Sequence, residues 1–344
     1  MKIKVIPVHE AVGTELAHDI TEIRPGEFKG AAFRRGHQVC DQDICHLQKL
    51  GKNHLYVLEL DEDDIHEDEA AAVLATALAG ENVVWDEGPR EGKIKLRAAV
   101  DGLFSVNVPA LAAFNMVEEV MCATLHTGTL VQKGDLVAAT RAIPLVMKRA
   151  PVERAAAIAR AHGGILSVRA LRRAKAGVII TGNEVYHGLI QDRFAPILAQ
   201  KLEALGSAIH VLRYAPDNAD AIRDAVDEAL RQGADLLLVT GGMSVDPDDV
   251  TRAGIAAAGA QAIHYGSAVL PGAMILTARI GAVPVLGVPA CALHHKVTVL
   301  DLILPRILAG DEIGKTQLAL MGHGGLCRDC PQCAYPHCPF GKGC

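Results

Sequence analysis

The chain has 344 residues, 50% of them hydrophobic, so it is long enough to fill more than one core. Its formal net charge of -6 argues against a nucleic-acid-binding protein, for which a strongly basic face is expected. No apolar stretch approaches the ~20 residues that span a bilayer, and segment 1–8 alternates Lys with aliphatic residues instead of resembling a signal peptide. We expect a cytoplasmic protein that acts on small molecules, without a membrane or nucleic-acid partner.

The first 170 residues mix short strands and helices and predict a separate β-rich α+β domain. Apolar residues alternate over 94–100 up to Asp101-Gly102, a pair typical of a two-residue hairpin turn, and the pattern resumes at Val106. The helices predicted in this region include one over 67–79 and one from Val108 to about Thr124.

From residue 171 the pattern changes to a regular alternation of strands and helices. Aliphatic runs near 177–181, 235–240 and 283–288 are typical of buried parallel strands, and Asp217 is expected to cap the helix after a strand at 208–214. We therefore predict a three-layer α/β/α domain with a mostly parallel sheet over 171–320, followed by a Cys-rich tail at 321–344.

Three of these predicted strands end in small or glycine-containing corners, at Thr181-Gly182, Thr240-Gly241-Gly242 and Pro289-Ala290. In open α/β sheets, ligands bind at the carboxyl ends of strands. A Gly corner lets backbone N–H groups approach an anion without interference from Cβ. A tight strand-to-helix turn is the other interpretation of Gly241-Gly242, but several corners on one sheet edge favour a site for a phosphate-bearing ligand.

Residues 176–311 resemble the molybdopterin-binding domain shared by molybdenum cofactor biosynthesis proteins of the MoeA and MogA type. The motifs that carry the resemblance are Thr181-Gly182-Asn183-Glu184, Gly241-Gly242-Met243-Ser244 and Asp248-Asp249-Val250-Thr251. Segment 6–20 is also similar to the opening of MoeA-type proteins. The resemblance implies a MogA-like fold and, for MoeA-type enzymes, insertion of molybdenum into adenylated molybdopterin with release of AMP in a step that requires a divalent cation.

The resemblance also implies ligands and residue roles. The ligands are molybdopterin or its adenylated form, molybdate and Mg²⁺, and MoeA-type relatives suggest a homodimer. The Cys-rich tail would suit contact with a protein partner in the cofactor pathway. Glu184 and Asp249 would be the catalytic carboxylates, although Asp248 and Asp249 are equally well interpreted as helix N-caps. The cofactor-binding residues would be Thr181, Gly182, Asn183, Thr240, Gly241, Gly242, Ser244, Asp248, Pro271, Gly272, Pro289 and Ala290.

Three departures from the family pattern leave the activity open. Asn183 stands where the family has Asp, Ala273 where it has Lys, and Ala290 where it has Gly, and the first two remove a charge. One hypothesis is a MoeA-type transferase. A second is a non-catalytic carrier or sensor of molybdopterin, and a third is a nucleotide pyrophosphatase of the CinA-like type.

The tail concentrates five of the nine cysteines in the chain, at Cys327, Cys330, Cys333, Cys338 and Cys344. The spacing differs by one residue from a bacterial ferredoxin run, and four thiolates can also hold zinc. We expect a metal site in the tail, either zinc or an iron–sulfur cluster, with redox-active or unpaired thiols as the alternative.

Overall fold

The computed structural model describes residues 2–24, 26–59, 61–85, 87–243 and 250–342. The chain divides into two compact units, each of which is described by itself. Unit 1 comprises Met1–Ala99, Val106–Leu125 and Lys133–Ser167, and unit 2 comprises Val100–Ser105, His126–Gln132 and Val168–Cys344. The predicted boundaries at 170 and 320 stay predictions. Within the described ranges, no helix is both long enough and apolar enough to span a bilayer.

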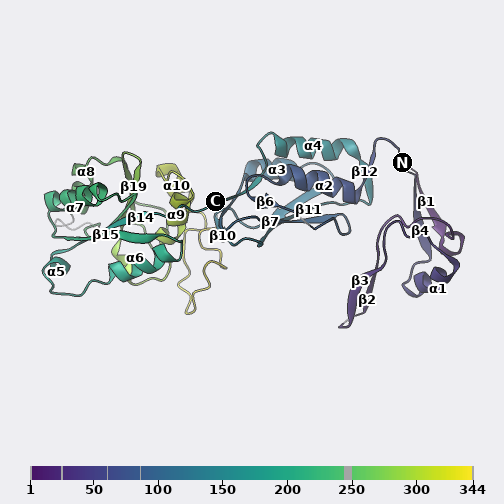
Figure 1. Ribbon diagram of the computed structural model, residues 1–344, viewed down its shortest axis with the longest axis horizontal. Coiled ribbons are helices and arrows are strands. Elements are labelled where there is room, and N and C mark those ends of the chain that lie inside the picture. Colours follow the sequence, from purple (N-terminus) through teal and green to yellow (C-terminus); the bar gives the residue numbers. More distant parts are fainter. Residues whose placement is uncertain (1, 25, 60, 86, 244–249, 343–344) are drawn as a thin grey trace. The chain divides into compact units, whose positions relative to one another are not determined.

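The first part of unit 1 is a small β-rich assembly (Figure 1). Strand β1 (Lys2–Pro7) pairs antiparallel with β4 (His54–Glu59), and β2 (Ile20–Arg24) pairs with β3 (Phe28–Phe33). A 3-10 turn, η1 (Val8–Glu10), follows β1, and the nine-residue helix α1 (Asp41–Lys49) precedes β4. Buried side chains from these elements, including Val8, Ile20 and Leu47, form its core.

The second part of unit 1 packs helices on a four-stranded sheet. Helix α2 (Glu67–Leu78) buries its small apolar side chains against α4 (Arg149–Arg160) and the sheet, and α3 (Val108–Asn115) also contacts α4. The strands in sheet order are β6 (Val83–Val84), β7 (Lys93–Ala98), β11 (Leu136–Ala142) and β9 (Val120–Thr124). A separate pair joins β5 (Asp64–His66) to β12 (Val146–Lys148).

Two details predicted for the first 170 residues are wrong. The segments on either side of Asp101-Gly102 are strands, but they do not pair: β7 lies between β6 and β11, whereas β8 (Gly102–Val106) lies between β10 (Thr129–Val131) and β13 (Leu166–Arg169). Long-range pairing therefore overrides the local turn signal. The helix that begins at Val108 ends at Asn115, because the side chain of Asn115 bonds both backbone groups of Cys122 in β9.

Unit 2 is built on a six-stranded, mostly parallel sheet, as predicted. Strand β14 (Lys175–Thr181) lies between β15 (Ala208–Ala215) and β16 (Leu236–Thr240), and β19 (Val283–Val288) continues beyond β16, all parallel. Strands β18 (Leu276–Ile280) and β17 (Gln261–Tyr265) complete the sheet in antiparallel orientation. Every residue of β16 is buried, as expected for a central parallel strand.

Helices cover both faces of this sheet, so the predicted three-layer arrangement is confirmed. Val178 and Ile180 of β14 pack with α6 (Phe194–Glu203) and α9 (Val299–Leu308), whereas Ile179 packs with α7 (Ala219–Arg231) and α8 (Thr251–Ala257). The alternation follows from the period of two along a strand. The remaining helical elements are α5 (Asn183–Tyr186), η2 (Ala290–Leu293) and α10 (Lys315–Leu320).

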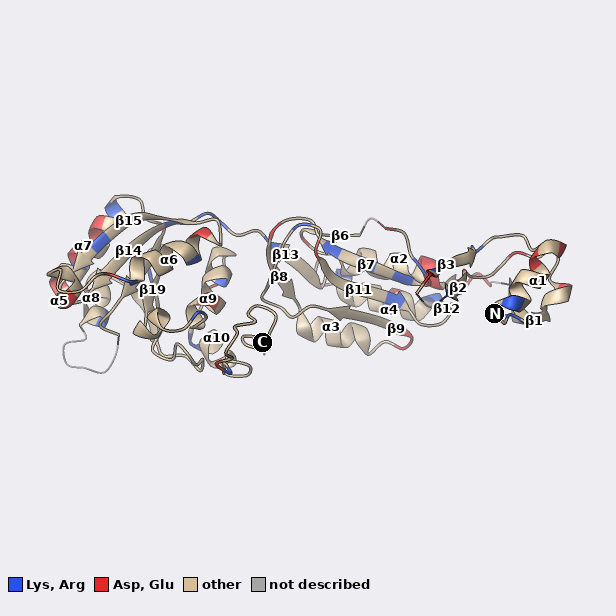
Figure 2. Cartoon of the chain, turned by 90° about the horizontal axis from the view of Figure 1, so that it is seen from below, with Lys and Arg blue, Asp and Glu red and all other residues tan. Residues whose placement is uncertain are grey.

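Helix α7 shows how the sequence sets such a layer. Ile222, Val226 and Ala229 form its buried stripe at helical spacing, and Asn218 caps its first turn by accepting a hydrogen bond from the Ala221 N–H. On the solvent side, Arg223 forms ion pairs with Asp220 and Asp224, and Figure 2 shows acidic and basic residues interspersed along this helix.

Candidate functional site

The carboxyl ends of three neighbouring parallel strands meet at one edge of the unit 2 sheet. In the register of the sheet, Ile180 of β14 pairs with Thr240 of β16, and Thr240 pairs with Val288 of β19. The corners that begin at Thr181, Gly241 and Pro289 therefore leave adjacent strands at the same level. We call this edge the strand-end site.

Three buried threonines tie the first two corners together. The Thr181 hydroxyl donates to the Thr240 carbonyl oxygen at 2.7 Å and lies 3.0 Å from the hydroxyl of Thr251, the first residue of α8. Because the Thr181 proton is used by the carbonyl, Thr251 is the donor between the two hydroxyls. The Thr240 hydroxyl is also buried and has no hydrogen-bond partner among the described residues. Within the described ranges, this edge thus holds a buried hydroxyl without a partner.

Gly241 and Gly242 are required by both conformation and space. Their φ angles are 81° and 52°, in the region that disfavours other residues. A Cβ on Gly241 would lie 2.5 Å from the Thr181 carbonyl oxygen, and one on Gly242 would lie 2.3 Å from the Thr251 hydroxyl oxygen. The main chain of the second corner therefore packs directly against Thr181 and Thr251, and there is no room for a side chain at either glycine.

The first corner is fixed by a reciprocal pair of hydrogen bonds. The Asn183 N–H donates to the Asp217 carboxylate at 2.9 Å, and the Asp217 N–H donates to the Asn183 side-chain oxygen at 3.1 Å. This pair joins the start of α5 to the chain just after β15. Glu184, the next residue, is exposed, and a Cβ added at Gly182 would lie 3.4 Å from its carboxylate oxygen.

The third corner and the preceding Pro-Gly pair are both joined to the segment that leads into α9. Pro289 caps η2, whose Ala292 is buried. The Val299 N–H, at the start of α9, donates to the Pro271 carbonyl oxygen at 3.1 Å, and a Cβ on Gly272 would lie 2.4 Å from the Val299 side chain. Burial raises the pKa of the neighbouring Cys291 thiol, which keeps it protonated and unreactive at neutral pH.

The structure thus brings together most residues that the sequence predicted, but contact with a ligand stays a prediction for all of them. Ser244, Asp248 and Asp249 lie outside the described residues. The catalytic role predicted for Asp249 and the binding roles of Ser244 and Asp248 therefore stay predictions, as does the catalytic role of Glu184.

Sequence reasoning missed two residues of this edge. Asp217 was expected to cap α7, but Asn218 does so, and Asp217 binds Asn183 instead. Thr251 belongs to a motif of the resemblance, yet only the structure reveals its contact with Thr181. The sequence did contain a signal for the role of Asp217. Asp217 and Asn218 are adjacent and both are typical capping residues, but only one of them can cap α7, so the other is free to bind elsewhere.

The four described cysteines of the tail lie along one cavity of about 430 Å³, together with His294, His295 and His337. Cys327 and Cys338 are partly buried against the core, whereas Cys330 and Cys333 are exposed. In the part of the chain that the structure describes, no three His, Cys, Asp or Glu side chains are close enough together to hold a metal ion. Cys344 lies outside that part, and the metal site stays a prediction.

Comparison with known proteins identifies the domain that carries the strand-end site. Residues 177–309 match a family model described as a probable molybdopterin binding domain, and residues 5–59 match one described as a domain of unknown function. Unit 2 therefore contains a domain that matches this family model.

Individual relatives cover only parts of the chain. A CinA-like protein from Desulfosudis oleivorans is 43% identical over 83 residues, which is 24% of this chain and 20% of that protein. The chain thus spans about a fifth of the length of the curated relatives it matches. Among solved structures, the Mog protein from Mycobacterium ulcerans has a TM-score of 0.35 and 21% identity, covering 40% of this chain and 97% of that one. A MoeA protein from Pyrococcus horikosii has a TM-score of 0.31 and 15% identity, with 89% and 75% covered.

Proposed function

We propose that the strand-end site binds molybdopterin through its phosphate and that the protein inserts molybdenum into the adenylated form in a step that requires Mg²⁺. The observation that carries the binding proposal is the Gly241-Gly242 corner, packed against buried threonine hydroxyls at the carboxyl ends of parallel strands. Such an edge is where open α/β sheets bind phosphate-bearing ligands.

The residues present fit this ligand. The positive φ angles of Gly241 and Gly242 let the chain turn tightly at the carboxyl end of β16, where backbone N–H groups can face a phosphate, and the Thr240 hydroxyl has no partner among the described residues. Glu184 is exposed beside Gly182 and would supply a carboxylate to Mg²⁺. Molybdopterin, when bound, supplies the two sulfur atoms that ligate molybdenum.

A turnover assay tests the proposed reaction. The full chain is incubated under anaerobic conditions with adenylated molybdopterin, molybdate and Mg²⁺, and AMP is quantified. We expect AMP release that depends on both molybdate and Mg²⁺ and that falls at least about tenfold in Glu184→Gln, because this removes a carboxylate ligand of the cation. Asp220→Asn, at an exposed carboxylate on α7, is the matched control and should retain the rate.

The second candidate function is a carrier of molybdopterin without turnover, and Asn183 is the observation that favours it. Its side-chain oxygen is occupied by the Asp217 N–H, and it lacks the charge with which an Asp could bind Mg²⁺ or act as a base. Tight binding of the pterin with no AMP release would establish this function instead.

Cleavage of a nucleotide pyrophosphate bond, with no response to molybdopterin, would favour the CinA-like alternative and reject both pterin proposals. The same assay detects it, because a nucleotide pyrophosphate supplied without pterin or molybdate would then release a mononucleotide. We also propose that the protein is a homodimer, which light scattering of the full chain would test.

A further inference from the structure

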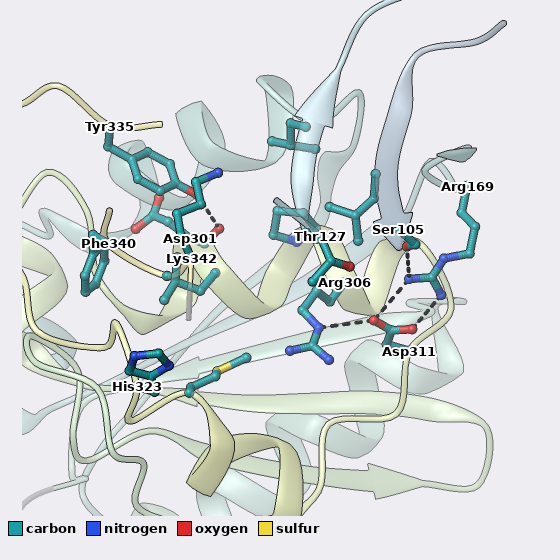
Figure 3. Close-up of a pocket in the computed structure, with 17 residues that line it drawn as sticks. Ser105, Thr127, Arg169, Asp301, Arg306, Asp311, His323, Tyr335, Phe340 and Lys342 are labelled. Carbon is teal, nitrogen blue, oxygen red and sulfur yellow. Dashed lines mark hydrogen bonds and ion pairs between the residues drawn. The ribbon is translucent and has the colours of Figure 1, made fainter. Parts of the chain in front are cut away.

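A second cavity in unit 2 is lined by none of the strand-end residues. Its volume is about 200 Å³, and its walls come from β8, the segment 127–130, α9 and the end of the tail (Figure 3). Organic ligands and cofactors usually occupy pockets of roughly 300–1,000 Å³, whereas one water takes up about 30 Å³. The cavity is therefore suited to a small ion with a few waters.

Positive charge exceeds negative charge around this cavity. Arg169 and Arg306 share the single carboxylate of Asp311: Arg169 contacts both of its oxygens, at 2.5 and 3.2 Å, and the Arg306 Nε donates to it at 3.1 Å. Burial by itself would raise the pKa of Asp311, but hydrogen bonds from both arginines outweigh it and lower the pKa. Asp311 is therefore ionised and neutralises only one of the two guanidinium groups.

The other carboxylate at the cavity, that of Asp301, is already paired. Lys201 contacts it at 2.5 Å, and it also accepts the N–H of Thr298, the N-cap of α9, at 2.8 Å. Among the residues that the structure describes, Lys342 therefore adds a positive charge with no carboxylate partner. Its ammonium group donates to the Thr129 hydroxyl at 3.2 Å, and burial lowers its pKa.

Several hydrogen-bond donors of the two arginines at this cavity also have no acceptor among the described residues. The two terminal nitrogens of Arg306 have no hydrogen-bond partner among the described residues, and the buried Nε of Arg169 has none either. Figure 3 shows Arg306, Lys342 and His323 on different sides of the cavity, with the free nitrogens of Arg306 turned away from the ammonium end of Lys342. Because partly buried cations without counterions are costly, an anion in the cavity would be stabilised.

We propose that this cavity binds a tetrahedral oxyanion such as inorganic phosphate, held by the terminal nitrogens of Arg306, with the positive charge of Lys342 adding attraction from another side of the cavity. A guanidinium group matches the paired oxygens of such an ion, and the apolar walls at Leu103, Leu302 and Phe340 strengthen the attraction. The cavity volume favours a free ion over a phosphate attached to an organic molecule. This proposal does not depend on the function of the strand-end site.

Calorimetric titration of the full chain with inorganic phosphate, in chloride buffer of low ionic strength, tests the proposal. We expect saturable binding of one phosphate per chain at this cavity. Arg306→Gln should weaken it about tenfold or more, because it removes charge-assisted hydrogen bonds, and Lys342→Met should weaken it about threefold or more, because it removes a positive charge from the cavity. Lys315→Gln, at an exposed lysine outside the cavity, is the control and should bind like the unmodified chain.

Because Arg306 also stabilises Asp311, thermal unfolding of each variant accompanies the titration, and Lys342→Met tests the site if Arg306→Gln is unstable. Sulfate and molybdate titrations form parallel arms, and saturable binding of any of the three ions that Lys342→Met weakens supports the site. The absence of saturable binding of all three, or binding that Lys342→Met leaves unchanged, would overturn the proposal.

Discussion

The two units differ in how they build their buried polar clusters. At the strand-end site of unit 2, the buried groups are the neutral hydroxyls of Thr181, Thr240 and Thr251. At the start of α2 in unit 1, the buried side chains are His66 and Glu67, both of which can ionise. The protonation state of a cluster of hydroxyls does not change across physiological pH. An ionisable cluster gains or loses protons in this range, so it makes the free energy of unfolding of its unit depend on pH.

The hydrogen bonds of His66 define its state. Its Nδ1 accepts from the Asp68 N–H at 3.2 Å and lies 2.9 Å from an Arg35 nitrogen, which can only donate, while its Nε2 lies 3.0 Å from the Ala17 carbonyl oxygen. His66 is therefore neutral, with its proton on Nε2. Burial lowers the pKa of His66, so protonation below the ordinary pKa of 6.5 destabilises unit 1.

Glu67 shows the opposite dependence and gives the largest expected effect. Burial, together with the negative charge of Asp68, raises the pKa of Glu67 from 4.5 to about 7. Below pH 4.5 the Glu67 carboxyl is protonated in both the folded and the unfolded chain, so it does not change the free energy of unfolding. Between pH 4.5 and about 7 the unfolded chain ionises while the folded chain keeps its proton, and the folded state loses stability.

Glu67→Gln should therefore stabilise unit 1 by up to about 3 kcal/mol at pH 8 relative to its effect at pH 4. Urea unfolding of both proteins across this range measures the difference, and the contribution of His66 cancels because it is common to both. Glu69→Gln is the control, since Glu69 is an exposed neighbour on the same helix. Parallel pH profiles for Glu67→Gln and the unmodified chain would show that Glu67 is not the buried acid that we describe.

Gly242→Ala tests the packed corner of unit 2. The new Cβ would meet the Thr251 hydroxyl oxygen at 2.3 Å in addition to the strain of a positive φ, so we expect a loss of about 2–3 kcal/mol in the free energy of unfolding. Gly259→Ala is matched to it, because Gly259 has a φ of 85° but open space around its Cβ, and should lose about 1 kcal/mol. Equal losses in the two variants would mean that the contact with Thr251 contributes nothing.

Thr181→Val should cost about 1–2 kcal/mol, because the Thr240 carbonyl and the Thr251 hydroxyl each lose a partner in a buried position. Since all three groups are neutral, the loss should be the same at pH 5 and pH 8. Thermal unfolding at both pH values measures it, with the exposed Thr316→Val as the control. If the loss of stability in Thr181→Val differed between pH 5 and pH 8, the threonine cluster would depend on pH as the His66 and Glu67 cluster does, which would contradict the comparison.

The cysteine tail should contribute least to global stability, because Cys330 and Cys333 are exposed. We expect anaerobically purified protein to contain zinc or iron, and Cys330→Ser with Cys333→Ser to lose that metal while unfolding within about 0.5 kcal/mol of the unmodified chain. Cys45→Ser, at an exposed cysteine in unit 1, should keep the metal. Metal-free protein from anaerobic purification would favour redox-active or unpaired thiols.

Sequence reasoning was most successful where burial leaves little choice. The uninterrupted apolar run of β16 and the glycines after it predicted the central strand and the tight turn at its carboxyl end, because few other structures accommodate such a pattern. It was least successful where partners are distant in sequence. The pairing of β7 with β11 and the bond between Asn183 and Asp217 depend on segments that no local pattern connects.

The central claim is that the glycine corner of unit 2 binds molybdopterin, and anaerobic calorimetric titration of the full chain with molybdopterin tests it most directly. We predict saturable binding of one pterin per chain to the unmodified protein and to Gly259→Ala, and at least about tenfold weaker binding to folded Gly242→Ala. No saturable binding to the unmodified chain, or equal affinity in Gly242→Ala, would contradict the account.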